Sequence, residues 1–318
     1  MSDLTRFAYF QGQIVPIEAA KVSVMTQSLH YGTGVFGGMR AYWNADQQQL
    51  YIFRPYDHFE RLIQSAAILR MDLGYTPARL LDILKELIQK EGFKTNCYIR
   101  PLAYISEQTL AVRVHDLESD LTIVVEPLGD SSYVNIDDGA HVCFSAWRRV
   151  DDNAIPARGK VVGAYVNSMM IKSDAMLAGY DDALVLNEDG HVAEFSAANA
   201  FIVRKGVAIT PPISANILEG VVRRSLIRVL REDLQVEVVE RNIDRTEVYL
   251  AEEIFMCGTG AQISPVTRIE YRSVGDGAIG PITRRLRDRY MNIVYGRVDK
   301  YREWVAPVYQ PEAVSTRS

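Results

Sequence analysis

Around Lys160 the chain reads Ala157-Arg158-Gly159-Lys160-Val161-Val162-Gly163-Ala164-Tyr165, which puts a lysine between a turn and an apolar run. A lysine flanked by small and apolar residues can lose part of its hydration. That loss lowers the pKa of the ammonium and frees an amine for imine formation. The alternative is a lysine at a strand end whose side chain extends to solvent. Lys160 is therefore the candidate nucleophile.

The pattern on both sides of this stretch predicts a mixed α+β chain rather than an alternating Rossmann pattern. Before Lys160, alternation predicts a hairpin at 7–15 and strands at 50–53, 97–105 and 121–126, and helical spacing predicts helices at 56–69 and 77–89. After it we expect strands at 141–147, 183–186, 191–194, 200–203, 207–210, 236–241 and 253–256, and helices at 165–177, 219–230 and 281–295.

Length and composition predict about two domains, because the chain has 318 residues and 48% of them are apolar. The segment 127–132 is polar and rich in turn formers, and it lies between two strand-like runs. We therefore expect a smaller N-terminal domain at 1–126, a linker at 127–136 and a larger domain at 137–318 that carries Lys160.

Charge and cysteine usage narrow the class of protein. Lys and Arg number 35 against 40 Asp and Glu, a net charge of −5, which disfavours nucleic acid as a partner. No apolar run approaches the ~20 residues that span a bilayer. Cys97, Cys143 and Cys257 lack metal-type spacing, and the histidines form no ligand pair, so we expect no metal. Buried free thiols favour a reducing, cytoplasmic setting.

Two segments offer backbone N–H groups to an anion. The first is the loop 210–223, which enters a helix at Gly220, where the N–H groups of Val221 and Val222 would point outward. The second is the turn Cys257-Gly258-Thr259-Gly260-Ala261, which adds a hydroxyl after an apolar strand. An ordinary helix start and a structural turn remain the alternatives for these two segments.

Two further stretches suit a pocket. Glu194 precedes the small residues of 195–199, and a carboxylate in such surroundings could hold a ligand's ring nitrogen protonated; the alternative is a surface glutamate. The segment 30–40 mixes aromatic residues with four glycines, so it can approach a ligand closely. It lacks the context of a nucleotide-binding loop.

The order of these features along the chain resembles the fold-type IV pyridoxal-phosphate (PLP) enzymes, and most closely the branched-chain amino acid aminotransferases. The likeness runs from about Tyr9 to Arg297. It rests on the segments 30–40, 58–62, 98–102, 157–165, 190–201, 210–223 and 253–266. It implies an α+β fold of two mixed domains, with the cofactor, pyridoxal 5'-phosphate, in the cleft between them.

The resemblance also implies roles for individual residues. Lys160 matches the lysine that forms an imine with the cofactor, Glu194 the acid at the pyridine nitrogen, and Tyr165 the tyrosine at the phenolic oxygen. Arg61 matches the arginine on the phosphate. The remaining cofactor contacts implied are those of Leu218, Gly220, Val221, Val222 and Thr259. The substrate pocket implied comprises Tyr31, Phe36, Gly38, Arg40, Tyr98, Arg100, Thr259 and Gly260.

A chain of this family would transfer an amino group between leucine, isoleucine or valine and 2-oxoglutarate by a ping-pong scheme. The resemblance further implies a homodimer or an assembly of dimers. In that assembly we expect the interdomain loop and the segment 108–114 to contribute to the neighbouring subunit's pocket.

Three departures from the family pattern widen the expected substrate range. Gly37 replaces a usual Glu, which we expect to open or depolarise the pocket, and Val222 replaces a usual Thr. Gly260 and Gln262 replace the commoner Ala and Glu. The alternatives left open are a D-amino-acid or (R)-amine transaminase, an aminodeoxychorismate lyase and, from a different class, a non-catalytic binding protein.

Overall fold

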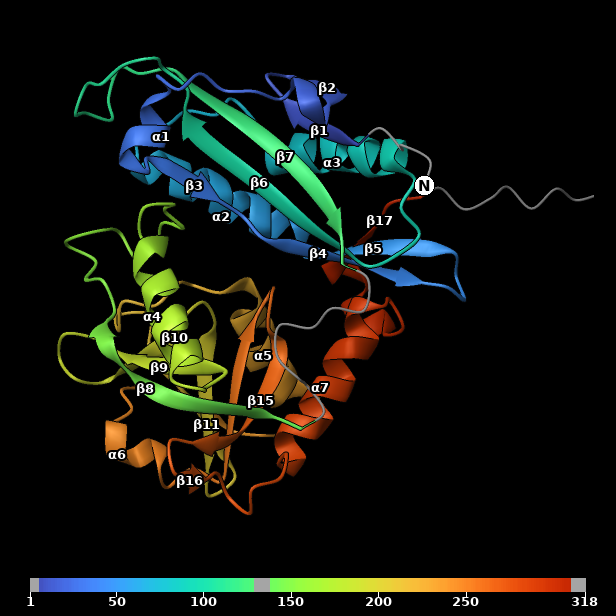
Figure 1. Ribbon diagram of the computed structural model, residues 1–318. Helices are drawn as coiled ribbons and strands as arrows, with labels where there is room; N and C mark the ends of the chain where they lie inside the picture. Colours follow the sequence, from blue (N-terminus) through green and yellow to red (C-terminus); the bar gives the residue numbers. More distant parts are fainter. Residues whose placement is uncertain (1–5, 129–137, 310–318) are drawn as a thin grey trace, which may run out of the picture.

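The computed structural model describes residues 6–128 and 138–309, and it contains two β-sheets with helices packed against them (Figure 1). The first sheet is built mainly from the N-terminal part of the chain and the second from residues after 139. Helices and strands are mixed in each half. The predicted α+β class is therefore confirmed.

The first sheet has eight strands, in the order β17-β5-β4-β6-β7-β1-β2 with β3 paired to β6. Their bounds are β1 Phe7–Phe10, β2 Gln13–Pro16, β3 Gly34–Phe36, β4 Met39–Asn44, β5 Gln49–Phe53, β6 Cys97–Ile105, β7 Ser119–Pro127 and β17 Val305–Pro307. The short helix α1 (Gln27–Tyr31) and a 3₁₀ turn at Ile17–Ala19 join β2 to β3.

Two helices, α2 (Pro55–Ile68) and α3 (Pro77–Glu91), pack against this sheet (Figure 1). The sequence explains the limits of α3: the Thr76 side chain accepts a hydrogen bond from the Arg79 N–H, and Gly92 ends the helix in the left-handed conformation. The leucines of α3, such as Leu80, Leu84 and Leu87, form one buried stripe. This stripe and the sheet enclose the core of the first half.

The second sheet has nine strands, in the order β10-β9-β8-β15-β14-β11-β12-β13 with β16 paired to β15. Their bounds are β8 Ala140–Arg148, β9 Asp182–Leu186, β10 Val192–Phe195, β11 Asn199–Arg204, β12 Val207–Thr210, β13 Val238–Glu240, β14 Glu253–Gly258, β15 Gln262–Ile269 and β16 Arg272–Ser273. Its helices are α4 Tyr165–Leu177, α5 Val221–Glu232, α6 Arg245–Val248 and α7 Pro281–Val294.

A shared core joins the two halves. Tyr42 and Phe53 of the first sheet pack with Phe201 and Phe255 of the second sheet and with side chains of α5 and α7. The final turn, a 3₁₀ segment at Asp299–Trp304, then returns the chain to the first sheet, where Val305 of β17 pairs with Phe53 of β5. The end of the predicted 137–318 unit thus adds a strand to the first sheet. The expected linker 127–136 lies almost wholly outside the described residues.

Several strands were not predicted from the sequence. β3 lies in the glycine-rich segment 30–40 and β4 begins there, although we predicted no strand in that segment, and the eight-residue β15 follows the Gly-Thr-Gly turn. β3 pairs with the distant β6. β4 and β15 each pair with a strand adjacent in the chain, β5 and β14, and also with a distant one, β6 and β8, so local alternation alone does not fix them. Where a strand depends on such partners for its stability, the local sequence carries a weak signal.

The three thiols are unpaired, as expected, but only Cys97 and Cys257 are buried, whereas Cys143 is half-buried. Among the described residues, no helix combines the length and the apolarity needed to cross a bilayer.

Candidate active site

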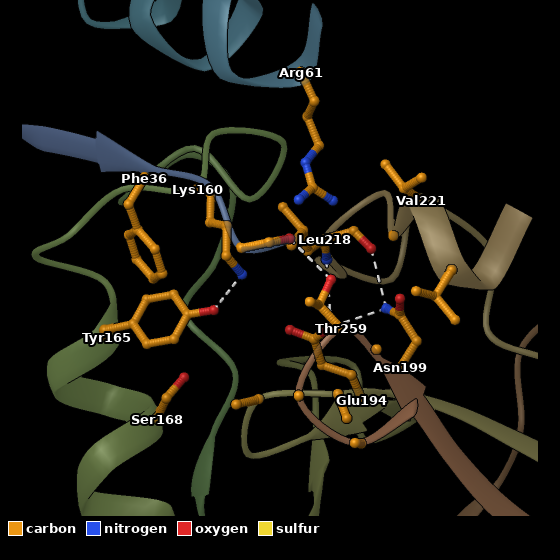
Figure 2. A pocket seen from close by; sticks show the side chains of 18 of the residues that line it. Phe36, Arg61, Lys160, Tyr165, Ser168, Glu194, Asn199, Leu218, Val221 and Thr259 are labelled. Carbon is orange, nitrogen blue, oxygen red and sulfur yellow. Dashed lines mark hydrogen bonds between the residues drawn. The ribbon is translucent and has the colours of Figure 1, made fainter. Parts of the chain in front are cut away.

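A cavity of about 310 Å³ lies where the two halves meet, and both contribute to its wall. Phe36, Gly38 and Arg61 come from the first half, and Lys160 and Glu194 from the second. Figure 2 shows Arg61 extending from a helix above, Lys160 lying beside it and Glu194 lying below. The other expected site residues in the wall are Tyr98, Arg100, Tyr165, Leu218, Gly220, Val221, Val222, Thr259 and Gly260.

Backbone hydrogen bonds fix the position of Lys160. The Phe36 N–H donates to the Lys160 carbonyl at 3.0 Å, and the Lys160 N–H donates to the Ser65 hydroxyl at 3.3 Å. Its ammonium donates to the Tyr165 hydroxyl at 2.5 Å (Figure 2). Burial, and then the charge of Arg61, lower the pKa of the Lys160 ammonium to about 7. An appreciable fraction of this amine is therefore neutral at physiological pH.

Tyr165 begins α4 and meets the edge of Phe36, with ring centroids 4.6 Å apart. Burial, and then the negative charge of Glu194, raise the pKa of Tyr165 to about 12. The phenol thus keeps its proton at neutral pH and can donate as well as accept a hydrogen bond.

Glu194 lies within β10 and is buried, which excludes the surface alternative. One carboxylate oxygen pairs with Arg149 Nε at 3.0 Å, and the other accepts from the Asn199 amide at 3.1 Å and from the Leu218 N–H at 3.4 Å. Burial raises the pKa of Glu194, while the charges of Arg149 and then Lys160 oppose that rise. These cations stabilise the ionised form in a buried place.

Sequence reasoning missed Arg149 and Asn199. Arg149 follows the last residue of β8 and is preceded by a second arginine, Arg148, so residue type does not tell the two apart. Alternation along a strand, which sends neighbouring side chains to opposite faces, is the one signal that separates them. Asn199 opposes Glu194 in the β10–β11 pair, a register that only the folded sheet defines.

The start of α5, where we expected an anion-binding site, lies at one end of the cavity. Gly220 is its N-cap, and no side chain caps the helix there, so the first-turn N–H groups of Val221 and Val222 remain available. Arg61 extends from α2 towards this point and donates to the Glu219 carbonyl at 3.1 Å (Figure 2). Burial lowers the pKa of Arg61 to about 10, which leaves it charged at neutral pH.

Packing favours glycine at position 220, because a Cβ there would collide with the Asn199 Oδ1. His58, also missed by sequence reasoning, lies three residues before Arg61 and lines the same cavity. Burial, and then the charges of Arg61 and Lys160, lower the pKa of His58 well below its usual value, so it is neutral. Its Nδ1 has no hydrogen-bond partner among the described residues.

The substrate side contains Tyr98, Arg100, Phe36 and the Thr259–Gly260 turn. Arg100 donates to the Tyr98 hydroxyl at 2.9 Å and lies over the Phe36 ring, 4.6 Å from its centroid. A Cβ on Gly38 would come within 2.5 Å of the Tyr98 hydroxyl, so a larger residue here would displace that hydroxyl. The Thr259 hydroxyl donates to the Gly38 carbonyl at 2.9 Å and would have to rotate to serve an anion.

Two expected pocket residues do not line this cavity. Tyr31 is exposed and donates to the Leu110 carbonyl at 2.9 Å, while Arg40 donates to the Gly260 carbonyl at 2.8 Å and so supports the turn. The expectation that Gly37 opens or depolarises the pocket gains no support from the cavity wall. Gly37 is not in the cavity wall, and a Cβ there would meet Pro101 Cγ at 2.7 Å. Adjacent residues of an extended segment face opposite ways, so Gly38 faces the cavity and Gly37 does not.

Comparisons with known proteins agree with this geometry. Residues 34–269 match the family model described as amino-transferase class IV. The chain is 46% identical over 303 residues to a probable branched-chain-amino-acid aminotransferase of Aquifex aeolicus, covering 95% of this chain and 97% of that one. It is 33% identical over 308 residues to the branched-chain-amino-acid aminotransferase of Escherichia coli strain K12, covering 96% of this chain and 98% of that one.

Solved structures give the same result. A branched-chain aminotransferase from Thermoproteus uzoniensis with norvaline superposes with a TM-score of 0.91 at 41% identity, covering 96% of this chain and all (100%) of that one. The branched-chain amino acid aminotransferase from Thermobaculum terrenum in its PLP form superposes with a TM-score of 0.90 at 39% identity, covering 96% of this chain and 99% of that one. The chain therefore belongs to the class IV aminotransferases and, within them, to the branched-chain-amino-acid aminotransferases.

Proposed function

We propose that this aminotransferase uses pyridoxal 5'-phosphate to transfer the amino group between leucine, isoleucine or valine and 2-oxoglutarate. The observation that carries the proposal is the convergence of Lys160, Tyr165, Glu194 and the start of α5 on one cavity. Relatives solved in a PLP form, with pyridoxamine 5'-phosphate or with a phosphopyridoxyl-glutamate adduct support the choice of cofactor.

The groups in the cavity fit this cofactor. Lys160 supplies an amine of lowered pKa for its aldehyde, and Glu194 supplies a buried carboxylate for its ring nitrogen. Arg61 and the first-turn N–H groups of α5 supply an anion-binding site for its phosphate. Leu218 provides an apolar contact for the ring. When bound, the cofactor supplies an electron sink for the negative charge that forms at the substrate Cα.

The protein's own residues then hold and move protons. Lys160, with a pKa near neutrality, can take a proton from the substrate Cα and would deliver it to the cofactor carbon, C4′, that receives the amino group. Tyr165 keeps its proton and contacts the Lys160 amine, so it orients that amine. Glu194 keeps negative charge facing the ring nitrogen.

Substrate selection rests on the wall around Phe36. Its ring and the edge of Tyr165 give an apolar surface for a branched aliphatic side chain. Tyr98 and the turn at Thr259–Gly260 offer donors for the α-carboxylate, and Arg100 adds a cation suited to the second carboxylate of 2-oxoglutarate. Because Gly37 lies outside the wall, it gives no support to the D-amino-acid, (R)-amine or lyase alternatives.

We also propose a homodimer or an assembly of dimers in the cytoplasm. Val24, Leu29, Leu110 and Val112 are large apolar side chains exposed on the segments around α1 and in 108–114. The Tyr31–Leu110 hydrogen bond joins these segments. An exposed apolar surface of this kind is typical of a subunit interface. A sedimentation measurement of the purified protein at several concentrations tests the assembly.

Lys160→Ala tests the function directly. We expect loss of turnover by on the order of 10⁴-fold or more, because no other group can replace the amine. Borohydride reduction followed by mass spectrometry should place the cofactor mass on Lys160 of the wild type. Lys94→Ala, an exposed lysine outside the cavity, is the matched control and should keep both the adduct and the rate.

A panel of amino donors completes the test. We expect L-leucine to be consumed far faster than D-alanine or (R)-1-phenylethylamine. A preference for D-alanine would overturn the substrate assignment, whereas an unmodified Lys160 in the wild type would overturn the cofactor assignment.

A further inference from the structure

Arg149 is the cation in direct contact with Glu194. Its Nε lies 3.0 Å from one carboxylate oxygen of Glu194 and also donates to the Asn216 carbonyl at 3.3 Å. The backbone N–H of Arg149 donates to the Leu186 carbonyl at 2.9 Å, which fixes the start of the side chain. The side chain is only 11% exposed and lines the cavity. Such a contact is held in place and is little screened by solvent.

The second oxygen of Glu194 is held by neutral donors. The Asn199 amide donates to it at 3.1 Å and also donates to the Leu218 carbonyl at 3.0 Å, so the amide is itself anchored (Figure 2). The Leu218 N–H adds a longer bond of 3.4 Å. The carboxylate therefore has a charged contact on one oxygen and uncharged contacts on the other.

Burial and charge oppose each other at this carboxyl. Burial favours the protonated acid and raises its pKa. The cations that oppose burial are Arg149 first, then Lys160, and then Arg223. Tyr165 stays neutral because its own pKa is raised, so it adds no negative charge. Of the three cations, Arg149 is the one in ion-pair contact with Glu194.

We propose that Arg149 is a positioning residue that keeps Glu194 ionised, so that the proton shared between Glu194 and the cofactor's ring nitrogen stays on the nitrogen. The inference rests on the function proposed above. Because Arg149 touches the carboxylate itself, its charge acts most strongly there and lowers that group's affinity for the proton. Without Arg149, one proton moves from the nitrogen to the carboxylate, and the ring accepts electrons less well.

The matched pair Arg149→Met and Arg148→Met tests this. Both remove one positive charge from adjacent positions, but the exposed Arg148 bonds to the Asn187 carbonyl at 2.6 Å and has no contact with Glu194. The readout is the ¹⁵N NMR shift of ring-labelled PLP in the holoenzyme across a pH series. We expect a protonated nitrogen in the wild type and in Arg148→Met, and a shift towards neutral pyridine in Arg149→Met.

Two further variants show whether the effect of Arg149→Met comes from the lost positive charge or from the changed side-chain shape. Arg149→Gln keeps a polar side chain without the charge, so we expect it to behave like Arg149→Met. Arg149→Lys keeps the charge and should restore part of the protonated signal. We expect kcat of Arg149→Met to fall on the order of tenfold or more, since the electrostatic support of the ring is lost.

If the ring nitrogen of Arg149→Met and Arg149→Gln gives the wild-type shift at every pH, the role of Arg149 is refuted. If Arg149→Met does not fold, Arg149→Gln decides the same question alone. Refutation of the role of Arg149 differs from a failure of the proposed function. If the proposed function were wrong, the wild-type protein itself would carry no cofactor on Lys160.

Discussion

The two ends of the cavity differ in how their polar groups are satisfied. At the Glu194 end, both oxygens of the buried carboxylate already have partners within the protein. At the α5 end, the helix has no side-chain cap, Arg61 is charged and His58 Nδ1 lacks a partner among the described residues. The first end is pre-organised and nearly neutral, and the second carries an excess of positive charge and free donors that an anion would complete.

This difference assigns separate tasks to the two ends. A group whose geometry is fixed before the ligand arrives can stabilise a charge that forms during the reaction without further rearrangement. A group left with unsatisfied donors gains most from the binding of the ligand itself. We therefore expect changes at the Glu194 end to affect kcat and changes at the α5 end to affect cofactor affinity.

The largest effect is expected at the Glu194 end. Glu194→Gln removes the negative charge and keeps the side-chain shape, and should lower kcat by on the order of 10²–10³-fold while cofactor affinity changes little. Steady-state kinetics and a fluorescence titration of the apoenzyme with PLP measure the two quantities. A wild-type kcat would contradict the role assigned to this carboxylate.

The α5 end should respond the other way. Arg61→Met should raise the Kd for PLP by roughly 10–100-fold, with a small change of kcat at saturating cofactor, because a charge-assisted contact to the phosphate is lost. Inorganic phosphate alone should stabilise the wild-type apoenzyme and so raise its Tm. At a phosphate concentration of 100 times its Kd the added free energy of unfolding is about 2.7 kcal/mol, and the gain should be smaller in Arg61→Met. If kcat falls equally in Arg61→Met and Glu194→Gln, the two ends of the cavity do not have separate roles.

The pKa of the Lys160 amine, which lies between the two ends, depends on the charges at both ends. With a Lys160 pKa of about 7, the rate at which PLP attaches to the apoenzyme should rise roughly tenfold between pH 6 and pH 8 and then level off, because the neutral amine reacts. Arg61 lowers this pKa and Glu194 raises it. The midpoint should thus move to higher pH in Arg61→Met and to lower pH in Glu194→Gln, as stopped-flow absorbance can follow.

The smallest effect concerns two adjacent glycines. Gly38→Ala should raise KM for L-leucine several-fold, because a Cβ at 2.5 Å would displace the Tyr98 hydroxyl. Gly37→Ala should leave KM unchanged and lower stability by ~1–3 kcal/mol, since its Cβ would press on Pro101. Kinetics and thermal unfolding of the pair check this. If KM changes in Gly37→Ala and not in Gly38→Ala, Gly37 rather than Gly38 faces the substrate.

Much of the fold followed from local sequence patterns. The helix 77–91 carries its own cap and periodicity, and the hairpin at 7–16 carries its own turn. The strands that sequence reasoning missed, β4 and β15, each have a partner adjacent in the chain and a distant partner, β6 for β4 and β8 for β15. β17, at the far end of the chain, pairs with β5, a partner that no local signal identifies.

The sequence by itself predicted Lys160, Glu194 and the helix start at Gly220 as site residues, and the order of these motifs along the chain, rather than any one of them, carried that prediction. Only the tertiary structure decided that Arg149 rather than Arg148 reaches Glu194, that Tyr31 and Arg40 lie outside the cavity, and that Gly38 rather than Gly37 faces it. The physical reason is that a side chain's chemistry is local, whereas its direction and partner depend on strand register and on how the two sheets pack.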